Sequence, residues 1–373
     1  MRLTRLEVAG VRNISLLSID CNPGLNLFVG PNGAGKSAII EAIYLLGRGR
    51  SFRSSSIVPL IQHGAETLRV GALLEDAQRG TANARLVRHL DGRSELRLND
   101  RAEKRISQIA RLMPMQLMLP DASSVVFGGP EERRKFVDWG TFHVEPSYLE
   151  GLREYQRVLQ QRNAILRAAN GRETGLAKES DVWTSRLIEL ALGVDRSRRG
   201  YLELLVPAIA AQLKALAPEL SVEVSYRSGW PEAVTLEESL SEGLSRDVKS
   251  GVTNCGPHRA DLRLDAGPGR AAATLSRGQA KVVASAMRLA QAQLTSDLGG
   301  RRSLFLIDDV GAELDQPHNE RFFRALEALG CQVFATATVA LPLSNAFAGA
   351  QRQLFHVEHG ACHPINADGG DTV

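Results

Sequence analysis

Residues 30–37, with the sequence GPNGAGKS, have the glycine and lysine spacing of a phosphate-binding loop. An apolar run ends at Val29, and a run with helical spacing begins at Ala38. The glycines allow backbone N–H groups to surround a β-phosphate, and the helix directs its positive end at the anion. Lys36 would reach the β- and γ-phosphate oxygens, and Ser37 would offer its hydroxyl to Mg²⁺. The segment therefore predicts ATP and Mg²⁺ as ligands. The residues expected to form the site are Gly30, Pro31, Asn32, Gly33, Ala34, Gly35, Lys36 and Ser37.

A carboxylate-bearing segment fits the same chemistry. The apolar residues 304–307 are typical of a buried parallel strand, and Asp308 and Asp309 follow directly. Asp308 is predicted to hold Mg²⁺, and Asp309 to orient or deprotonate the attacking water. Because Asp309 is one methylene shorter than a glutamate, slow hydrolysis is expected. The alternative is a strand that merely ends in solvated acids.

Residues 275–279, with the sequence LSRGQ, lead into a run with helical spacing. They resemble the signature motif of the ABC ATPases, and this resemblance implies a site shared by two copies of the chain. Ser276, Gly278 and Gln279 would then face the γ-phosphate bound by the other copy. The alternative is a simple helix cap, since serine is a favourable N-cap residue.

The same resemblance implies further site residues. Gln116 stands where a Q-loop would report on Mg²⁺ and the γ-phosphate, and Asp315 belongs to a segment similar to the D-loop. The histidine expected after the strand near 332–334 is absent, and Thr336 or Thr338 stands there instead. The sensor of the γ-phosphate is therefore left open.

Several segments together resemble the bacterial RecF family. They are PMQL at 114–117, GGPEERR at 128–134, GPHRADL at 256–262, LSRGQ at 275–279 and IDD at 307–309. The resemblance spans essentially the whole chain. It implies a weak, DNA-dependent ATPase that forms an ATP-dependent homodimer and binds single-stranded and gapped double-stranded DNA. It also implies RecR and RecO as partners, loading of RecA downstream, and no membrane partner.

The elements that must position these residues follow from the apolar pattern. Period-two alternation in the first hundred residues predicts short strands, with a hairpin turn at Asp91 and Gly92. Helical spacing from about 131 to 219 predicts a helical arm with two long helices and a third near 202–216. We therefore expect an α/β ABC-type P-loop ATPase head with N-terminal antiparallel strands and an inserted arm. The predicted domains are 1–130 and 221–373 for the head and 131–220 for the arm.

Composition is compatible with these predictions. The chain has 373 residues, enough for two or three cores, and 43% of them are hydrophobic. No apolar run approaches the length of a bilayer span, and no secretory signal is evident, which favours a cytoplasmic protein. The four cysteines are far apart in the sequence, which argues against a disulfide framework or a structural zinc site.

Candidate DNA contacts are less well defined. The cluster Arg133, Arg134 and Lys135 at the start of the arm could neutralise phosphates, or its arginines could bridge structural elements. The resemblance places His258 and Arg259 near the ATP interface, where Arg259 could stabilise charge on a γ-phosphate. The alternative there is a turn held by Asp261.

Two other function classes remain possible from the sequence. One is the nucleotide-binding subunit of a membrane ABC transporter. The long separation between Ser37 and Leu275, with a helical arm between them, argues against it. The other is a nuclease or motor, but no D-x-D or H-x-H cluster apart from the ATP site and no helicase-type motif is evident.

Overall fold

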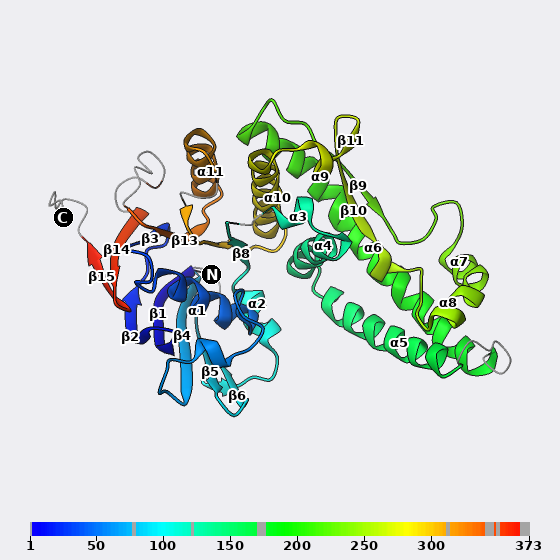
Figure 1. The fold of residues 1–373 in the computed structure, drawn as a ribbon, viewed down its shortest axis with the longest axis horizontal. Coiled ribbons are helices and arrows are strands. Elements are labelled where there is room, and N and C mark those ends of the chain that lie inside the picture. The colour runs from blue at the N-terminus through cyan, green and yellow to red at the C-terminus, as the bar shows by residue number, and fades with distance from the viewer. Residues whose placement is uncertain are drawn as a thin grey trace. The chain divides into compact units, whose positions relative to one another are not determined.

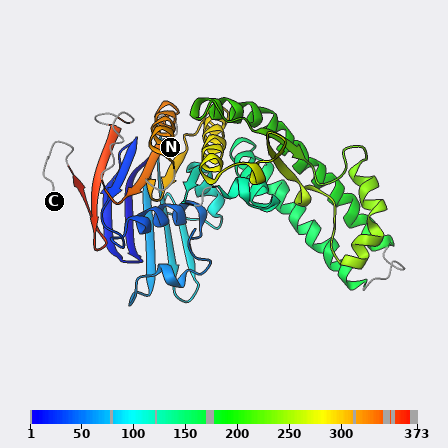
Figure 2. The same cartoon turned by 45° about the horizontal axis from the view of Figure 1, so that its top comes forward.

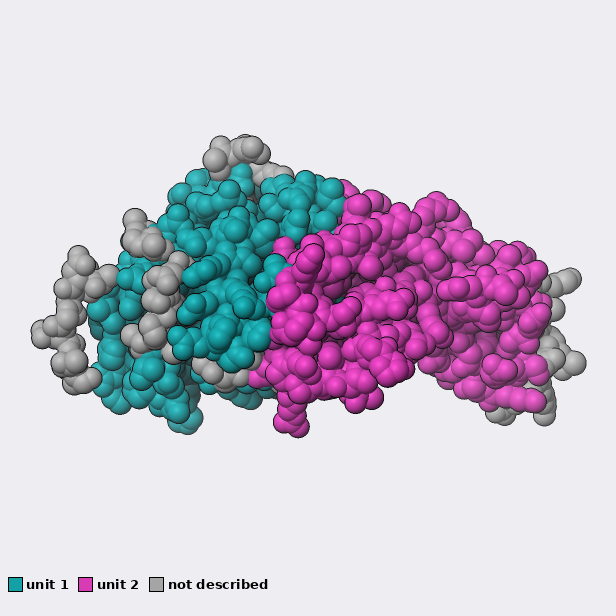
Figure 3. Space-filling model, turned by 90° about the horizontal axis from the view of Figure 1, so that it is seen from above, with its two compact units in different colours: residues 1–122, 215–217, 285–373 teal, residues 123–214, 218–284 magenta. Residues whose placement is uncertain are grey.

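The computed structural model describes residues 2–76, 80–120, 123–169, 177–310, 314–339, 347 and 351–365. The chain divides into two compact units, which Figure 3 shows in separate colours. Unit 1 comprises residues 1–122, 215–217 and 285–373, and unit 2 comprises residues 123–214 and 218–284. None of the described helices combines the length and the apolar character that a bilayer crossing requires.

The N-terminal part of unit 1 forms a six-stranded antiparallel sheet in the order β2-β1-β4-β5-β6-β7. Alternation of buried and exposed side chains along the strands gives the sheet one buried face. Gly92, with a φ of 88°, occupies the predicted turn between β5 and β6. The strands are β1 (Arg2–Val11), β2 (Ile14–Asp20), β4 (Thr67–Asp76), β5 (Gly80–His89), β6 (Ser94–Leu98) and β7 (Arg101–Ala102).

The second sheet of unit 1 is six-stranded, in the order β15-β14-β3-β13-β12-β8. All neighbouring pairs are parallel except β14 and β15, so most carboxyl ends meet at one edge. Figures 1 and 2 show these strands beside the antiparallel sheet. The strands are β3 (Leu25–Val29), β8 (Met115–Met118), β12 (Leu304–Ile307), β13 (Gln332–Ala337), β14 (Arg352–Glu358) and β15 (Ala361–Ile365).

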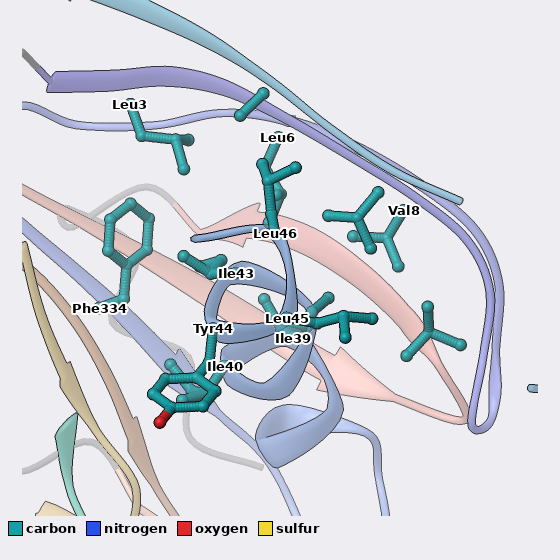
Figure 4. Packing of buried hydrophobic residues seen from close by; sticks show 14 of the residues in the cluster. Leu3, Leu6, Val8, Ile39, Ile40, Ile43, Tyr44, Leu45, Leu46 and Phe334 are labelled. Carbon is teal, nitrogen blue, oxygen red and sulfur yellow. The ribbon is translucent and has the colours of Figure 1, made fainter. Parts of the chain in front are cut away.

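Helix α1 (Lys36–Arg48) lies in the core between the two sheets. In Figure 4 its side chains, Ile43 among them, lie between Leu6 of β1 and Phe334 of β13. Leu6, Ile43 and Phe334 are fully buried. Burial on nearly all sides fixes the helix that follows the phosphate-binding loop. The short elements η1 (Val58–Leu60) and α2 (Ile106–Leu112) complete this part of unit 1.

Helix α11 (Gln316–Ala328) packs on the other face of the parallel strands. The rings of Phe305 on β12 and Phe322 on α11 have centroids 6.1 Å apart. Leu304 and Leu306, which alternate with Phe305, belong instead to the core around α1. The parallel strands are therefore covered on both faces, which explains their continuous apolar runs.

Unit 2 contains long helices and a three-stranded sheet in the order β11-β10-β9. Helix α6 ends in residues assigned to unit 1, and α10 begins in unit 2 and continues into unit 1. The helices are α3 (Ser124–Phe127), α4 (Pro130–Val144), α5 (Tyr148–Ala168), α6 (Ala177–Leu216), α7 (Leu236–Glu242), α8 (Leu244–Ser250), η2 (Pro257–Arg259), α9 (Ala271–Thr274) and α10 (Arg277–Asp297). The strands are β9 (Glu223–Arg227), β10 (Asp261–Ala266) and β11 (Gly269–Arg270).

The predicted α/β class, with N-terminal antiparallel strands and a helical insertion, is confirmed. One helix prediction is wrong. The second long helix of the prediction, near 183–194, and the third, near 202–216, are one helix of 40 residues, α6, with Pro207 inside it. The apolar pattern fades between them because the buried stripe there includes a charged residue, Arg198, which is 2% exposed.

The chain also divides differently from the predicted domains. Unit 2 takes in residues 221–284, which the sequence assigned to the C-terminal part of the head. The predicted arm at 131–220 lies in unit 2 apart from residues 215–217. The functional division into head and arm stays a prediction.

Candidate nucleotide-binding site

A cavity of about 560 Å³ opens beside the phosphate-binding loop of unit 1. Gly35, the N-cap of α1, has a φ of 115°, in the left-handed region that favours glycine. The loop thus leads into the positive end of a buried helix, as an anion site requires. The described residues that line the cavity are Arg12, Asn13, Asn32, Gly33, Gly35, Lys36, Ser37, Ala38, Arg53, Pro120, Asp308, Asp309, Thr336, Ala337 and Thr338.

Lys36 is held by the loop that it belongs to. Its Nζ donates to the carbonyl oxygens of Gly30, at 2.6 Å, and Pro31, at 2.9 Å. Burial lowers the pKa of Lys36, and the neighbouring Asp308 and Asp309 oppose that shift. Of the predicted loop residues, Gly30, Pro31 and Ala34 are not among those lining the cavity, and Ala34 is buried. These three residues shape the loop and do not face the cavity.

The predicted metal ligands come together at the same cavity. Ser37 Oγ donates to Asp308 Oδ1 at 2.8 Å, and Thr336 Oγ1 donates to the same oxygen at 2.9 Å. The backbone N–H of Asp309 donates to Thr336 Oγ1 at 2.8 Å, and Asp309 has a φ of 65°. Thr336, one of the two threonines that stand where the ABC pattern has a histidine, therefore links the two acids.

The donor set fits Mg²⁺. A hydroxyl and a single carboxylate supply oxygen ligands, and Mg²⁺ usually completes its shell with phosphates and water. No group of three or more His, Cys, Asp or Glu side chains suited to a metal occurs in the described part of the chain. This arrangement suits a metal that arrives with the nucleotide better than one held by protein alone.

Some cavity residues were not identified from the sequence. Asn13 Nδ2 donates to the carbonyl oxygens of Gly33, at 3.2 Å, and Ala34, at 3.1 Å, which braces the loop from the turn between β1 and β2. Arg53 Nη2 lies 3.1 Å from Asp308 Oδ2 and is about half exposed. Both belong to segments that no motif covers, so only their position after folding could reveal them.

Gln116 lies away from this cavity. It sits in β8 opposite Phe305 of β12, and its Nε2 donates to Gln291 Oε1 at 3.1 Å. Phe305 faces α11, so Gln116 points to the sheet face opposite α1. It is 6% exposed and does not line the cavity. Its role at the γ-phosphate stays a prediction that this geometry does not support.

The signature segment forms an exposed helix start in unit 2. The backbone N–H of Gln279 donates to Ser276 Oγ at 3.2 Å, and the N–H of Ser276 donates to Gln279 Oε1 at 2.9 Å. This reciprocal pair is a capping box. Ser276, Gly278 and Gln279 are all exposed. The segment is thus both a helix cap and an accessible surface. We call residues 276–279 the signature tip.

Asp315 caps another helix. Its Oδ1 accepts from the backbone N–H of His318 at 3.0 Å at the start of α11. This bond holds the pKa of Asp315 below its usual value. The preceding Glu313 lies outside the described residues.

Comparison with known proteins decides the family. The family model "RecF/RecN/SMC N terminal domain" matches residues 2–361. A protein of Marinomonas sp. (strain MWYL1), "DNA replication and repair protein RecF", is 39% identical over 337 residues, 90% of either chain. The chain belongs to the RecF family.

Solved structures agree with that membership. A structure of "the recombination mediator protein RecF-ATP in RecFOR pathway" is similar with a TM-score of 0.84 and 25% identity over 98% of each chain. A Smc head domain from Pyrococcus furiosus has a TM-score of 0.61 at 19% identity, covering 98% of this chain and 96% of that one. The latter shows the shared fold alone.

In this member of the RecF family, the predicted basic cluster is largely engaged in contacts within unit 2. Arg133 Nε and Nη2 contact the carboxylate of Asp261 at 2.7 and 3.1 Å. Arg134 Nη1 donates to Ala260 O at 2.8 Å. Lys135 is about half exposed and pairs with two glutamates of its own helix. The geometry favours the structural alternative for Arg133, and DNA contact by the cluster stays a prediction.

Proposed function

We propose that the protein is an ATP-dependent DNA-binding protein of recombinational repair and replication restart. Membership of the RecF family supports this proposal, since the similar proteins are named for DNA replication and repair. The similar structure with ATP is described as a recombination mediator of the RecFOR pathway. The same membership favours DNA repair over the transporter alternative.

The observation that carries the proposal is the distribution of phosphate-binding groups. Lys36, Ser37 and Asp308 gather at one cavity in unit 1. The signature tip, in unit 2, is a helix start capped by its own side chains and exposed to solvent. A helix start of this kind is suited to binding an anion. We infer that ATP joins the loop of one copy to the signature tip of a second copy.

The chain's own residues suggest how hydrolysis proceeds. Lys36 would neutralise charge on the β- and γ-phosphates, and Ser37 with Asp308 would hold the Mg²⁺, which polarises the phosphate oxygens. Asp309 would orient or deprotonate the attacking water. Its backbone N–H donates to Thr336, which holds its main chain at the end of β12. Since a short aspartate occupies this position, hydrolysis is expected to be slow, acting as a switch that releases the dimer.

The partners follow from the family. We expect single-stranded and gapped double-stranded DNA as ligands and RecR and RecO as protein partners. Loading of RecA would occur downstream, in the cytoplasm.

Sedimentation and fluorescence anisotropy can test this function. Wild-type protein should dimerise with Mg-ATP and bind gapped DNA more tightly with ATP than without it. Lys36→Ala should lose ATP binding, and Ser276→Arg should lose dimerisation while keeping ATP binding. Ser94→Arg, at an exposed position on β6, serves as a control of equal charge. Unchanged dimerisation of both Lys36→Ala and Ser276→Arg would contradict the shared site.

A further inference from the structure

The turn before β10 is fixed by side chains from the long helices of unit 2. Arg198 Nη1, from α6, donates to Pro257 O at 2.7 Å. Tyr155, from α5, has its hydroxyl 2.6 Å from His258 Nδ1. His258 Nε2 lies 2.9 Å from Thr253 O. Because a carbonyl can only accept, Nε2 of the neutral ring carries the proton and Nδ1 accepts from Tyr155.

The residues after the turn are fixed in the same way. Arg134, from α4, donates to Ala260 O at 2.8 Å. Arg133, also from α4, holds the Asp261 carboxylate with two hydrogen bonds, at 2.7 and 3.1 Å. Such a bidentate pair fixes direction as well as distance. Helices α4, α5 and α6 thus each contribute contacts to the segment 257–261.

Arg259 is the exception within this segment. Its backbone N–H donates to Gly256 O at 2.8 Å, so its main chain is ordered. Its side chain is exposed and makes no hydrogen bond or ion pair with any residue that the structure describes. A guanidinium is therefore presented to solvent on a backbone whose neighbours are all held in place.

The supporting contacts are themselves buried. Arg198 is 2% exposed and also contacts Asp138 Oδ1, at 2.8 Å, and Tyr148 Oη, at 3.0 Å. Tyr155 is 1% exposed. Folding of unit 2 therefore already orders the backbone that carries Arg259. A ligand of Arg259 would need to order only one side chain, which favours binding.

The local charge favours an anion. Burial lowers the pKa of His258, and the nearby guanidinium groups of Arg259 and Arg134 lower it further. The His258 ring is therefore neutral near pH 7. The carboxylate of Asp261, on the same segment, is already held by Arg133. A phosphate would find an arginine fork without displacing an internal partner.

The position in unit 2 separates this arginine from the signature tip. Strand β10 begins at Asp261, after the turn, and pairs with β11 at its other end, through Asp265 and Ala266. The strand's rise places those ends about 16 Å apart. Helix α9, which leads to the signature tip, follows β11, and Figure 1 shows both at that end of β10. A phosphate at Arg259 is therefore not the nucleotide phosphate at the tip.

We propose that Arg259 is a contact for the phosphate backbone of DNA, presented by the rigid turn at residues 256–261. This inference rests on the proposed function, because it assigns a surface to the DNA that the protein binds. The expected DNA contact thereby changes from Arg133 to Arg259. The side-chain donors of Arg133 already bond to other residues of unit 2. A phosphate contact does not distinguish base sequences. Its loss should therefore lower the affinity for DNA of any sequence to the same extent.

The test is a salt titration of DNA affinity by fluorescence anisotropy, with Mg-ATP present and with duplex and gapped DNA. Arg259→Ala should weaken binding about 10-fold and reduce the slope of log affinity against log salt by about 0.9. Arg259→Lys should keep the slope and recover part of the affinity. Arg153→Ala, which replaces an exposed arginine of α5, is the matched control. It should change the DNA affinity and the salt slope less than Arg259→Ala does.

A further variant tests the positioning. Tyr155→Phe removes the hydroxyl that holds His258 and no charge, so it should weaken DNA binding while leaving the salt slope unchanged. If Arg259→Ala keeps wild-type affinity and slope, the inference is overturned and the proposed function stands. If Arg259→Ala loses dimerisation but binds DNA normally, the arginine contacts protein and the inference is again overturned. If wild-type protein binds no DNA with or without ATP, the proposed function itself fails.

Discussion

Ser37 Oγ and Asp308 Oδ1 lie 2.8 Å apart, although 271 positions separate them in the chain. The bond joins the start of α1 to the end of β12, and Thr336 at β13 donates to the same carboxylate oxygen at 2.9 Å. Three segments of unit 1 thus converge on one oxygen. This convergence makes the geometry of the site depend on each of the three side chains.

Replacing Thr336 by valine should slow ATP hydrolysis about 10-fold with little change in ATP affinity. Valine keeps the shape but removes the donor to Asp308 and the acceptor for the Asp309 N–H. Thr336→Ser, which keeps the hydroxyl, is the matched control and should retain most activity. Single-turnover hydrolysis and nucleotide titration measure the two effects. Normal hydrolysis in a well-folded valine variant would mean that Thr336 does not position the acids.

Replacing Gln116 by methionine should lower stability and leave hydrolysis within about two-fold of wild type. The hydrogen bond that Gln116 donates to the buried Gln291 oxygen would be lost, which costs about 1 kcal/mol. The nucleotide cavity would be unchanged, because Gln116 faces the opposite side of the sheet. Urea denaturation and an ATPase assay measure the two quantities, with Asp308→Asn as the variant expected to lose hydrolysis. A large loss of hydrolysis in stable Gln116→Met protein would restore the Q-loop role.

Replacing Arg162 by methionine should destabilise unit 2 by about 3–5 kcal/mol. Arg162 Nη1 lies 2.8 Å from Asp247 Oδ2, and both residues are 1% exposed. The single variant leaves a buried carboxylate without its cation. The double variant with Asp247→Asn should recover part of the lost free energy of unfolding, as measured by urea denaturation. Arg186→Met, which breaks an exposed ion pair with Glu154, should leave the midpoint unchanged.

Stability of unit 2 should fall as the pH falls below about 6.5, in part because of His258. Burial lowers the pKa of His258 in the folded state, so the unfolded chain takes up the proton first. The stabilising contribution is therefore complete above the ordinary pKa of about 6.5 and lost as the pH falls through the folded value. Denaturation between pH 7.5 and 5 should show a shallower pH dependence in His258→Gln.

An exposed histidine provides the control for that experiment. His63→Gln replaces an imidazole ring that is exposed to solvent, and this variant should keep the wild-type pH dependence. Identical pH profiles for wild type and His258→Gln would show that the ring titrates equally in both states.

The sequence by itself determined the local parts of this protein. The phosphate-binding loop, the strand that ends at Asp308 and the capping segment at Ser276 are each contiguous. Their geometry depends on a strand, a turn or a helix start within a few residues. The N-terminal strands were predicted for the same reason, since period-two alternation is a property of neighbouring residues.

Only the tertiary structure decided how distant side chains meet. Thr336 reaches Asp308 because β12 and β13 are neighbours, and Gln116 turns away because its place in β8 directs it to the other sheet face. Arg133 finds Asp261, which sequence patterns could not assign as its partner. Strand order and pairing are long-range choices made by the whole core, so no local pattern encodes which polar groups will face one another.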